Sequence, residues 1–188
     1  MDDERYMQAA LEQARLAGAA GEVPIGAVVV RDGRIIARAR NTREESQDPA
    51  GHAEFTAIRQ AAAVLGTWRL SGCTVYVTLE PCIMCAGLMH QARIDRCVFG
   101  AFDPKAGALG TLYAIHEDSR LNHVFEAQGG MLEGECAQLL KDFFAARRAA
   151  RKQARAAQVD APDIPATQQV NTQTGCPSDG TPASGRTV

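Results

Sequence analysis

The stretch that decides the fold is residues 74–92, which read TVYVTLEPCIMCAGLMHQA. Residues 74–79 combine β-branched, aromatic and apolar side chains, and this composition predicts a strand. Pro81 follows, and proline suits the first turn of a helix because that turn does not need the missing N–H. We therefore expect a helix over residues 82–92. A strand that leads directly into a helix is typical of α/β folds with parallel strands.

The rest of the chain extends this pattern on both sides. Asp32-Gly33 joins two β-rich runs and is typical of a two-residue type I′ hairpin, so we expect an antiparallel pair in the sheet. The spacing of apolar residues predicts the other elements. In chain order, we expect a helix over residues 4–19, strands over 25–30 and 34–39, a helix over 52–65, the strand and helix above, a strand over 96–101, and a long helix from about Leu132 to residue 156. These elements predict a three-layer α/β/α sandwich around a mixed five-stranded sheet.

Length and charge restrict the function classes. With 188 residues, 46% of them hydrophobic, the chain suffices for one compact domain with an appended segment. Its 22 acidic and 20 basic residues give a net charge of −2, so a nucleic-acid partner requires a local basic patch. The first residues are acidic rather than apolar, and no apolar run approaches the length of a membrane span. We expect a cytoplasmic protein with no membrane partner.

The composition changes near residue 158. Of the last 31 residues, 158–188, 19 are Pro, Gly, Ser, Thr, Gln or Asn, and none is aromatic. Such a segment has little apolar surface to bury on folding. We therefore predict a folded domain over residues 1–157, which carries the motifs described next, and a disordered C-terminal tail over residues 158–188.

A cysteine pair marks the start of the helix that follows Pro81. Cys82 and Cys85 are three residues apart, so their sulfurs lie on one face of the first turn. The partial positive charge at a helix N-terminus favours thiolates, which are the metal-binding form of cysteine. Without a secretory signal, a close cysteine pair indicates metal or redox chemistry more often than a disulfide.

His52 offers a third ligand to the same metal. Its helix is also expected to begin at the edge where parallel strands end, so the two helix starts can face each other. One imidazole, two thiolates and an open fourth position are typical of a catalytic zinc site. The sequence therefore predicts zinc on His52, Cys82 and Cys85.

Glu54 completes the expected chemistry. It lies two residues after His52, but side chains in a first helical turn tilt toward the helix N-terminus and can both reach the space beyond it. We predict that Glu54 is not a ligand but a base that takes a proton from water and returns it to the substrate.

Each motif alone has a plainer interpretation. A His-x-Glu at a helix start is commonly a capping or surface feature, since Glu is favoured in any first turn. Cys-x-x-Cys also serves dithiol redox chemistry. The rival hypotheses are a redox protein that uses Cys82 and Cys85, and a catalytically idle binding module.

The combined motifs resemble a known group of enzymes. His52-Ala53-Glu54 with Pro81-Cys82-x-x-Cys85 is the recognised signature of the zinc-dependent nucleobase deaminase superfamily. Over residues 4–152 the chain is more specifically similar to the bacterial tRNA-specific adenosine deaminases. This similarity rests on residues 23–28 (VPIGAV), Asn41, Asp48-Pro49, residues 76–87 (YVTLEPCIMCAG), residues 99–107 (FGAFDPKAG), Phe143-Phe144 and Arg147-Arg148.

The resemblance implies a cytidine-deaminase-like fold and a set of roles. One zinc ion per subunit would be held by His52, Cys82 and Cys85, with Glu54 as proton shuttle. The base would be held by Asn41 and the backbone N–H of Ala53, in a pocket lined by Val23 and Pro24. The resemblance also implies a homodimer that converts adenosine to inosine at the wobble position, 34, of an arginine tRNA with an ACG anticodon. The alternative is a free nucleobase or nucleoside deaminase, of cytosine or guanine type, with the same zinc site.

The sequence offers an independent indication of RNA binding. Residues 141–155, KDFFAARRAARKQAR, hold six basic residues and one acid. We interpret Phe144 as a support for a flipped base and Arg147 as a phosphate ligand in the anticodon stem-loop. The plainer alternative is that this basic helix is a solvated face.

A few further residues carry weaker expectations. Asp103 and Lys105 follow a strand end on the side of the expected site, so we interpret both as substrate contacts, with a turn role as the alternative. Cys73, Cys97 and Cys136 lack a partner at metal spacing and are expected to be small buried thiols. Trp68 is expected to pack beneath the loop before residue 74.

Overall fold

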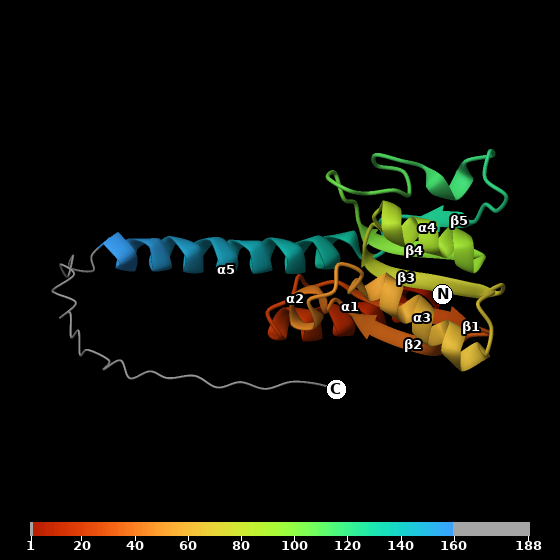
Figure 1. The fold of residues 1–188 in the computed structure, drawn as a ribbon, viewed down its shortest axis with the longest axis horizontal. Helices are drawn as coiled ribbons and strands as arrows, with labels where there is room; N and C mark the ends of the chain where they lie inside the picture. The colour runs from red at the N-terminus through yellow and green to blue at the C-terminus, as the bar shows by residue number, and fades with distance from the viewer. Residues whose placement is uncertain (1, 160–188) are drawn as a thin grey trace, which may run out of the picture.

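In the computed structural model, which describes residues 2–159, five strands form one mixed sheet with helices on both faces (Figure 1). The strands are β1 (Gly26–Arg31), β2 (Arg34–Arg40), β3 (Cys73–Leu79), β4 (Arg96–Ala101) and β5 (Glu126–Gln128). The helices are α1 (Asp3–Ala19), α2 (Arg43–Ser46), α3 (Ala53–Leu65), α4 (Ile83–Ala92), the 3₁₀ helix η1 (Ile115–Glu117) and α5 (Glu133–Val159). Apart from the short α2, η1 and β5, these elements match those predicted from the sequence.

The strand order is β2-β1-β3-β4-β5. Strand β1 runs antiparallel to both of its neighbours, whereas β3, β4 and β5 are parallel. The hairpin between β1 and β2 turns at Asp32 and Gly33, which have φ angles of 49° and 72°. Positive φ at both central residues is the mark of the type I′ turn, so the predicted hairpin is confirmed.

Two separate cores give the predicted three layers. On one face, Met7 and Leu11 of α1 and Cys136 of α5 are buried against the sheet. On the other face, Ile58 of α3 and Met89 of α4 pack against the central strands. The three-layer α/β/α sandwich is confirmed, and Cys73, Cys97 and Cys136 are buried free thiols as expected.

Strand direction decides where a site can form. Because β1 is antiparallel to β2 and to β3, those two strands run in the same direction although they are not neighbours. Their C-terminal ends therefore meet at one edge of the sheet, and α3 and α4 both begin there. The loops at this edge are where ligands bind in open α/β sheets.

The long C-terminal helix differs in detail from its prediction. Leu132, expected on the helix, precedes it with a φ of 52°, and α5 continues to Val159. Beyond about residue 144 the helix extends away from the sheet (Figure 1). The remainder of the predicted tail, residues 160–188, lies outside the described residues.

The prediction for Trp68 is wrong. Its side chain is 57% exposed, and the Arg69 guanidinium carbon lies 4.4 Å from its ring centroid. The ring is held by a cation–π contact on the surface rather than by packing beneath a loop.

In residues 2–159 no helix combines the length and the apolarity that crossing a membrane requires.

Candidate metal centre and adjoining cavity

His52 and Cys82 occupy equivalent places in two different helices. Each is the N-cap residue, with extended backbone angles of φ −82°, ψ 146° for His52 and φ −73°, ψ 172° for Cys82. Neither side chain forms a capping hydrogen bond with its own helix. Both side chains are therefore directed beyond the helix ends, where they meet the Cys85 thiol from the first turn of α4.

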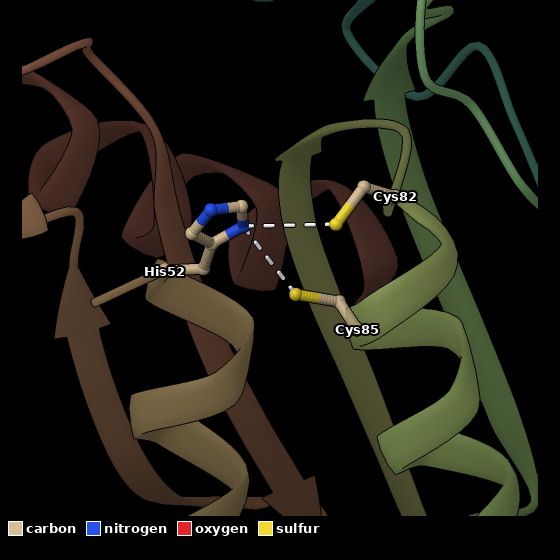
Figure 2. Close-up of side chains that lie close together, drawn as sticks. All are labelled: His52, Cys82 and Cys85. Carbon is tan, nitrogen blue, oxygen red and sulfur yellow. Dashed lines mark hydrogen bonds between the residues drawn. The ribbon is translucent and has the colours of Figure 1, made fainter. Parts of the chain in front are cut away.

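These three side chains form what we call the metal corner: His52, Cys82 and Cys85 (Figure 2). The His52 Nδ1 atom lies 3.7 Å from the Cys82 sulfur and 3.6 Å from the Cys85 sulfur. Zn–S bonds of about 2.3 Å and a Zn–N bond of about 2.0–2.1 Å, set at tetrahedral angles, place nitrogen and sulfur about 3.6 Å apart. The donor set and its spacing thus fit a zinc ion.

Hydrogen bonds within the metal corner give its two thiols different pKa values. The pKa of Cys82 is lowered to about 4, first by a hydrogen bond from Cys85 and then by one from His52. The same hydrogen bond, together with burial, raises the pKa of Cys85. Cys82 therefore carries a thiolate at neutral pH, and a divalent cation that binds here displaces the proton of Cys85.

Glu54 lies in the first turn of α3 with only 4% of its surface exposed. Burial is the main cause that raises the pKa of its carboxyl. Among the described residues, the side chains close enough together to hold one metal ion are those of the metal corner, and Glu54 is not one of them. A buried carboxyl with a raised pKa, close to a metal site, has the character of a group that accepts and returns protons.

A cavity of about 350 Å³ adjoins the metal corner at His52. It is lined by Glu22, Val23, Ile25, Asn41, Arg43, Glu44, His52 and Arg147. We call four of these residues the cavity wall: Glu22, Val23 and Ile25, which precede β1, and Asn41, which directly follows β2. Its volume is in the range of small-molecule sites.

The structure brings some of the predicted substrate residues together at this cavity. Val23, Asn41 and Arg147 line it. The N–H of Ala53 is the first amide of α3, one of the amides that a helix leaves without an internal acceptor. Pro24 is buried and is not among the lining residues.

Other predicted residues lie elsewhere. Phe144 is 42% exposed on α5, beside Phe143, which is half-buried and has the Arg147 guanidinium 5.7 Å from its ring. Asp103 accepts a hydrogen bond of 2.9 Å from the Lys105 N–H, and neither residue lines the cavity. This geometry is that of a turn, the alternative considered for both residues.

Glu80 is a buried acid that the sequence interpretation missed. Its carboxylate accepts hydrogen bonds from the backbone N–H groups of Asp103, Leu109 and Thr111, at 3.0–3.1 Å, and from the Thr111 hydroxyl. It also occupies the space that a side chain at Gly107 would need. Gly107 of this loop forms a β-bridge with Cys82, so Glu80 supports the metal corner at Cys82.

The missed cavity residues gave weak sequence signals. Arg43 and Glu44 lie on α2, which is too short to show helical periodicity. Glu22 did carry a signal, since it is a charged residue directly before the apolar run 23–30. In the structure it is 1% exposed. An acid that is buried beside an apolar segment requires hydrogen-bond partners in the fold.

This fold and site are those of the cytidine-deaminase-like nucleobase deaminases. The sheet is covered on both faces, and the metal corner lies beside Glu54. A model of the MafB19-like deaminase family matches residues 1–148. The chain is 52% identical over 153 residues to a tRNA-specific adenosine deaminase of Bacillus subtilis, covering 81% of this chain and 95% of that one. It is 46% identical to that of Haemophilus influenzae, covering 80% and 87%. The chain belongs to the deaminase family of these tRNA-specific adenosine deaminases.

Solved structures agree with this assignment. One, from biochemical and structural studies of A-to-I editing by tRNA:A34 deaminases, superposes with a TM-score of 0.70 and 46% identity, covering 72% of this chain and 99% of that chain. A guanine deaminase from Nitrosomonas europaea superposes with a TM-score of 0.67 and 26% identity, covering 76% and 84%.

Proposed function

We propose that the protein hydrolyses the C6 amine of adenosine, giving inosine and ammonia, at the wobble position, 34, of an arginine tRNA with an ACG anticodon. The observation that carries the proposal is the metal corner beside buried Glu54, next to a cavity bordered by Arg147. The relatives described as tRNA-specific adenosine deaminases support tRNA as the substrate class. The A34 deaminase structure supports the wobble position.

Each residue of the site has a separate role in the proposed deamination. His52, Cys82 and Cys85 would hold one zinc ion per subunit, which when bound supplies Lewis-acid activation of water. Glu54 takes the proton of the attacking water, delivers it to the ring nitrogen next to C6, and then helps to protonate the leaving amine. Asn41 and the Ala53 N–H bind the base, and the buried surroundings of Glu54 keep its proton exchange directed to the substrate.

Charge on α5 supports an RNA substrate. Five basic residues follow one another on α5 at spacings of one or three residues: Arg147, Arg148, Arg151, Lys152 and Arg155. At about 100° per residue they fall within about 140° of one side of the helix, with Phe144 in the same arc. A row of cations that begins at the cavity and includes an exposed aromatic suits the phosphates and bases of an anticodon stem-loop.

We also propose a homodimer in the cytoplasm, where bacterial tRNA is modified. An apolar pocket of about 410 Å³ lies on the outer surface of α3 and α4, lined in part by Ile58, Ala62, Trp68 and Leu88. A second copy of the chain would cover this surface and the exposed Trp68. Light scattering of the purified protein measures the mass directly, and Trp68→Arg is expected to shift it toward the monomer.

The test of the proposed function is an editing assay. Wild type, Glu54→Ala and the isosteric Glu54→Gln are incubated with an unmodified arginine tRNA carrying ACG, and reverse transcription reads A-to-G conversion. The same tRNA with C at position 34, which cannot give an A-to-G signal there, is the substrate control. Conversion confined to position 34, and reduced about 10²–10⁴-fold in both variants with zinc content unchanged, is expected. Conversion that persists in both variants contradicts the role of Glu54.

Deamination of a free nucleobase is the second candidate function. The superposition with a guanine deaminase favours it, because the same fold serves a free base there. Steady-state kinetics on guanine, cytosine, adenosine and cytidine separate the two. Efficient turnover of any of these, with no conversion of the tRNA, would replace the proposed substrate.

A further inference from the structure

A buried carboxylate in the cavity wall has no role in the mechanism above. Glu22 is 1% exposed and lies between α1 and β1, beside Asn41. Among the described residues no ion pair involves it. Burying a carboxylate without a cation is costly unless hydrogen bonds compensate, so the bonds that Glu22 does form must matter to the fold or to the site.

The first of these bonds fixes a side-chain amide. Glu22 Oε2 accepts a hydrogen bond of 3.2 Å from Asn41 Nδ2. An ionised carboxylate only accepts hydrogen bonds, so the amide nitrogen must face it and the carbonyl oxygen must face away. The Asn41 backbone is fixed as well, because its N–H donates to the Ile25 carbonyl at 2.9 Å. The rotation that exchanges Oδ1 and Nδ2 of Asn41 is therefore blocked by Glu22.

The second bond fixes the rim of the cavity. Glu22 Oε1 accepts a hydrogen bond of 2.7 Å from the Glu45 N–H, which belongs to α2. The same short helix carries Arg43 and Glu44, which line the cavity. One carboxylate therefore holds both the amide of Asn41 and the backbone of α2.

We propose that Glu22 is a positioning residue that sets which hydrogen-bonding atoms of Asn41 face the nucleobase. This proposal rests on the proposed function, since it takes the cavity as the base pocket. An asparagine amide has nearly the same shape in its two orientations but presents a donor in place of an acceptor. A pocket that selects bases through hydrogen bonds loses selectivity when a donor and an acceptor exchange places.

Glu22→Gln is the variant that isolates this role. The glutamine carbonyl keeps the bond to Glu45 N–H, but its NH₂ group now faces Asn41, whose amide must turn to accept. We expect kcat/KM on the tRNA to fall about tenfold, because the turned Asn41 amide mismatches one neutral hydrogen bond with the base. Zinc content should not change. Glu12→Gln, at an exposed acid on α1, is the matched control and should retain wild-type kinetics.

A double-mutant cycle then asks whether Glu22 acts through Asn41. In an Asn41→Ala background, Glu22→Gln should have less than about a twofold further effect, because the amide that it orients is absent. A tenfold loss in both backgrounds would overturn the proposal, and so would wild-type kinetics for Glu22→Gln alone.

An exchange of the two partners separates positioning from stability. Glu22→Gln with Asn41→Asp restores every hydrogen bond, with donor and acceptor reversed. We expect it to recover the melting temperature and part of kcat/KM, because the aspartate again turns an acceptor oxygen toward the base. A recovered melting temperature with kcat/KM as low as in Glu22→Gln alone would show that the atom presented at position 41 does not explain the loss, and would overturn the proposal. If the wild type deaminates a free base but not the tRNA, the proposed function fails, and the same variants are compared on that base.

Discussion

The metal corner and the cavity wall meet at His52 but are built in different ways. The metal corner comes from two helix starts, and its residues are set by the spacing of short motifs. The cavity wall comes from the irregular segment before β1 and the residue after β2, and its members have no fixed spacing, so Val23 and Asn41 were predicted only from the family resemblance. Each region depends on one buried glutamate, Glu80 or Glu22, that accepts backbone N–H groups. The chemistry of the site is thus encoded locally, whereas the shape that selects a substrate depends on tertiary contacts.

Cys82→Ser is expected to have the largest effect, because it breaks the metal corner alone. The substitution removes the thiolate with the lowered pKa, so zinc content should fall from one per chain toward zero and deamination should be lost. Metal analysis after purification without chelator measures this. Binding of an anticodon stem-loop is expected to remain within a fewfold of wild type. Full zinc content in the variant would remove Cys82 from the ligand set.

Charge reversal on α5 is expected to act on the cavity side only. Arg147→Glu, Arg148→Glu and Arg151→Glu, made together, should raise KM for the tRNA by at least about tenfold and leave zinc content unchanged. Affinity should also depend less steeply on salt, since each lost phosphate contact lowers the slope by about 0.7–0.9. Filter binding at several salt concentrations measures both. An unchanged salt slope would make this helix a solvated face.

Asp3→Asn is expected to have the smallest effect, a loss of stability, and it tests a site far from both regions. Hydrogen bonds from Arg96 and then from Tyr76 lower the pKa of Asp3 below its ordinary value of 3.8. The stability that this adds is present above pH 3.8 and is lost as the pH falls through the lowered pKa. The variant should be about 1 kcal/mol less stable at pH 7, with unchanged zinc content, and the difference should shrink below pH 4. Urea unfolding at pH 7 and pH 3 measures it, and a constant difference would contradict the linkage.

The sequence predicts the metal corner well because its signals are local. Pro81 and the spacing of Cys82 and Cys85 place the thiols on one turn, and alternating strands and helices place both helix starts at one edge of the sheet. Glu22 and Arg43 could not be assigned in the same way. Their roles depend on how the segment before β1 packs against α2, which no periodicity records. Trp68 was misplaced because a solitary aromatic has no pattern that distinguishes burial from a surface cation–π contact.

The position of β1 between β2 and β3 has a consequence for how the protein acquires its metal. His52 and Cys82 are 30 residues apart in the chain and follow strands that never pair with each other. We expect them to come within reach only after β1 has paired on both of its sides. Contacts of this kind form late, because the loops must close before the contacts stabilise anything. Metal uptake during refolding therefore serves as a kinetic signal that the centre of the sheet is complete.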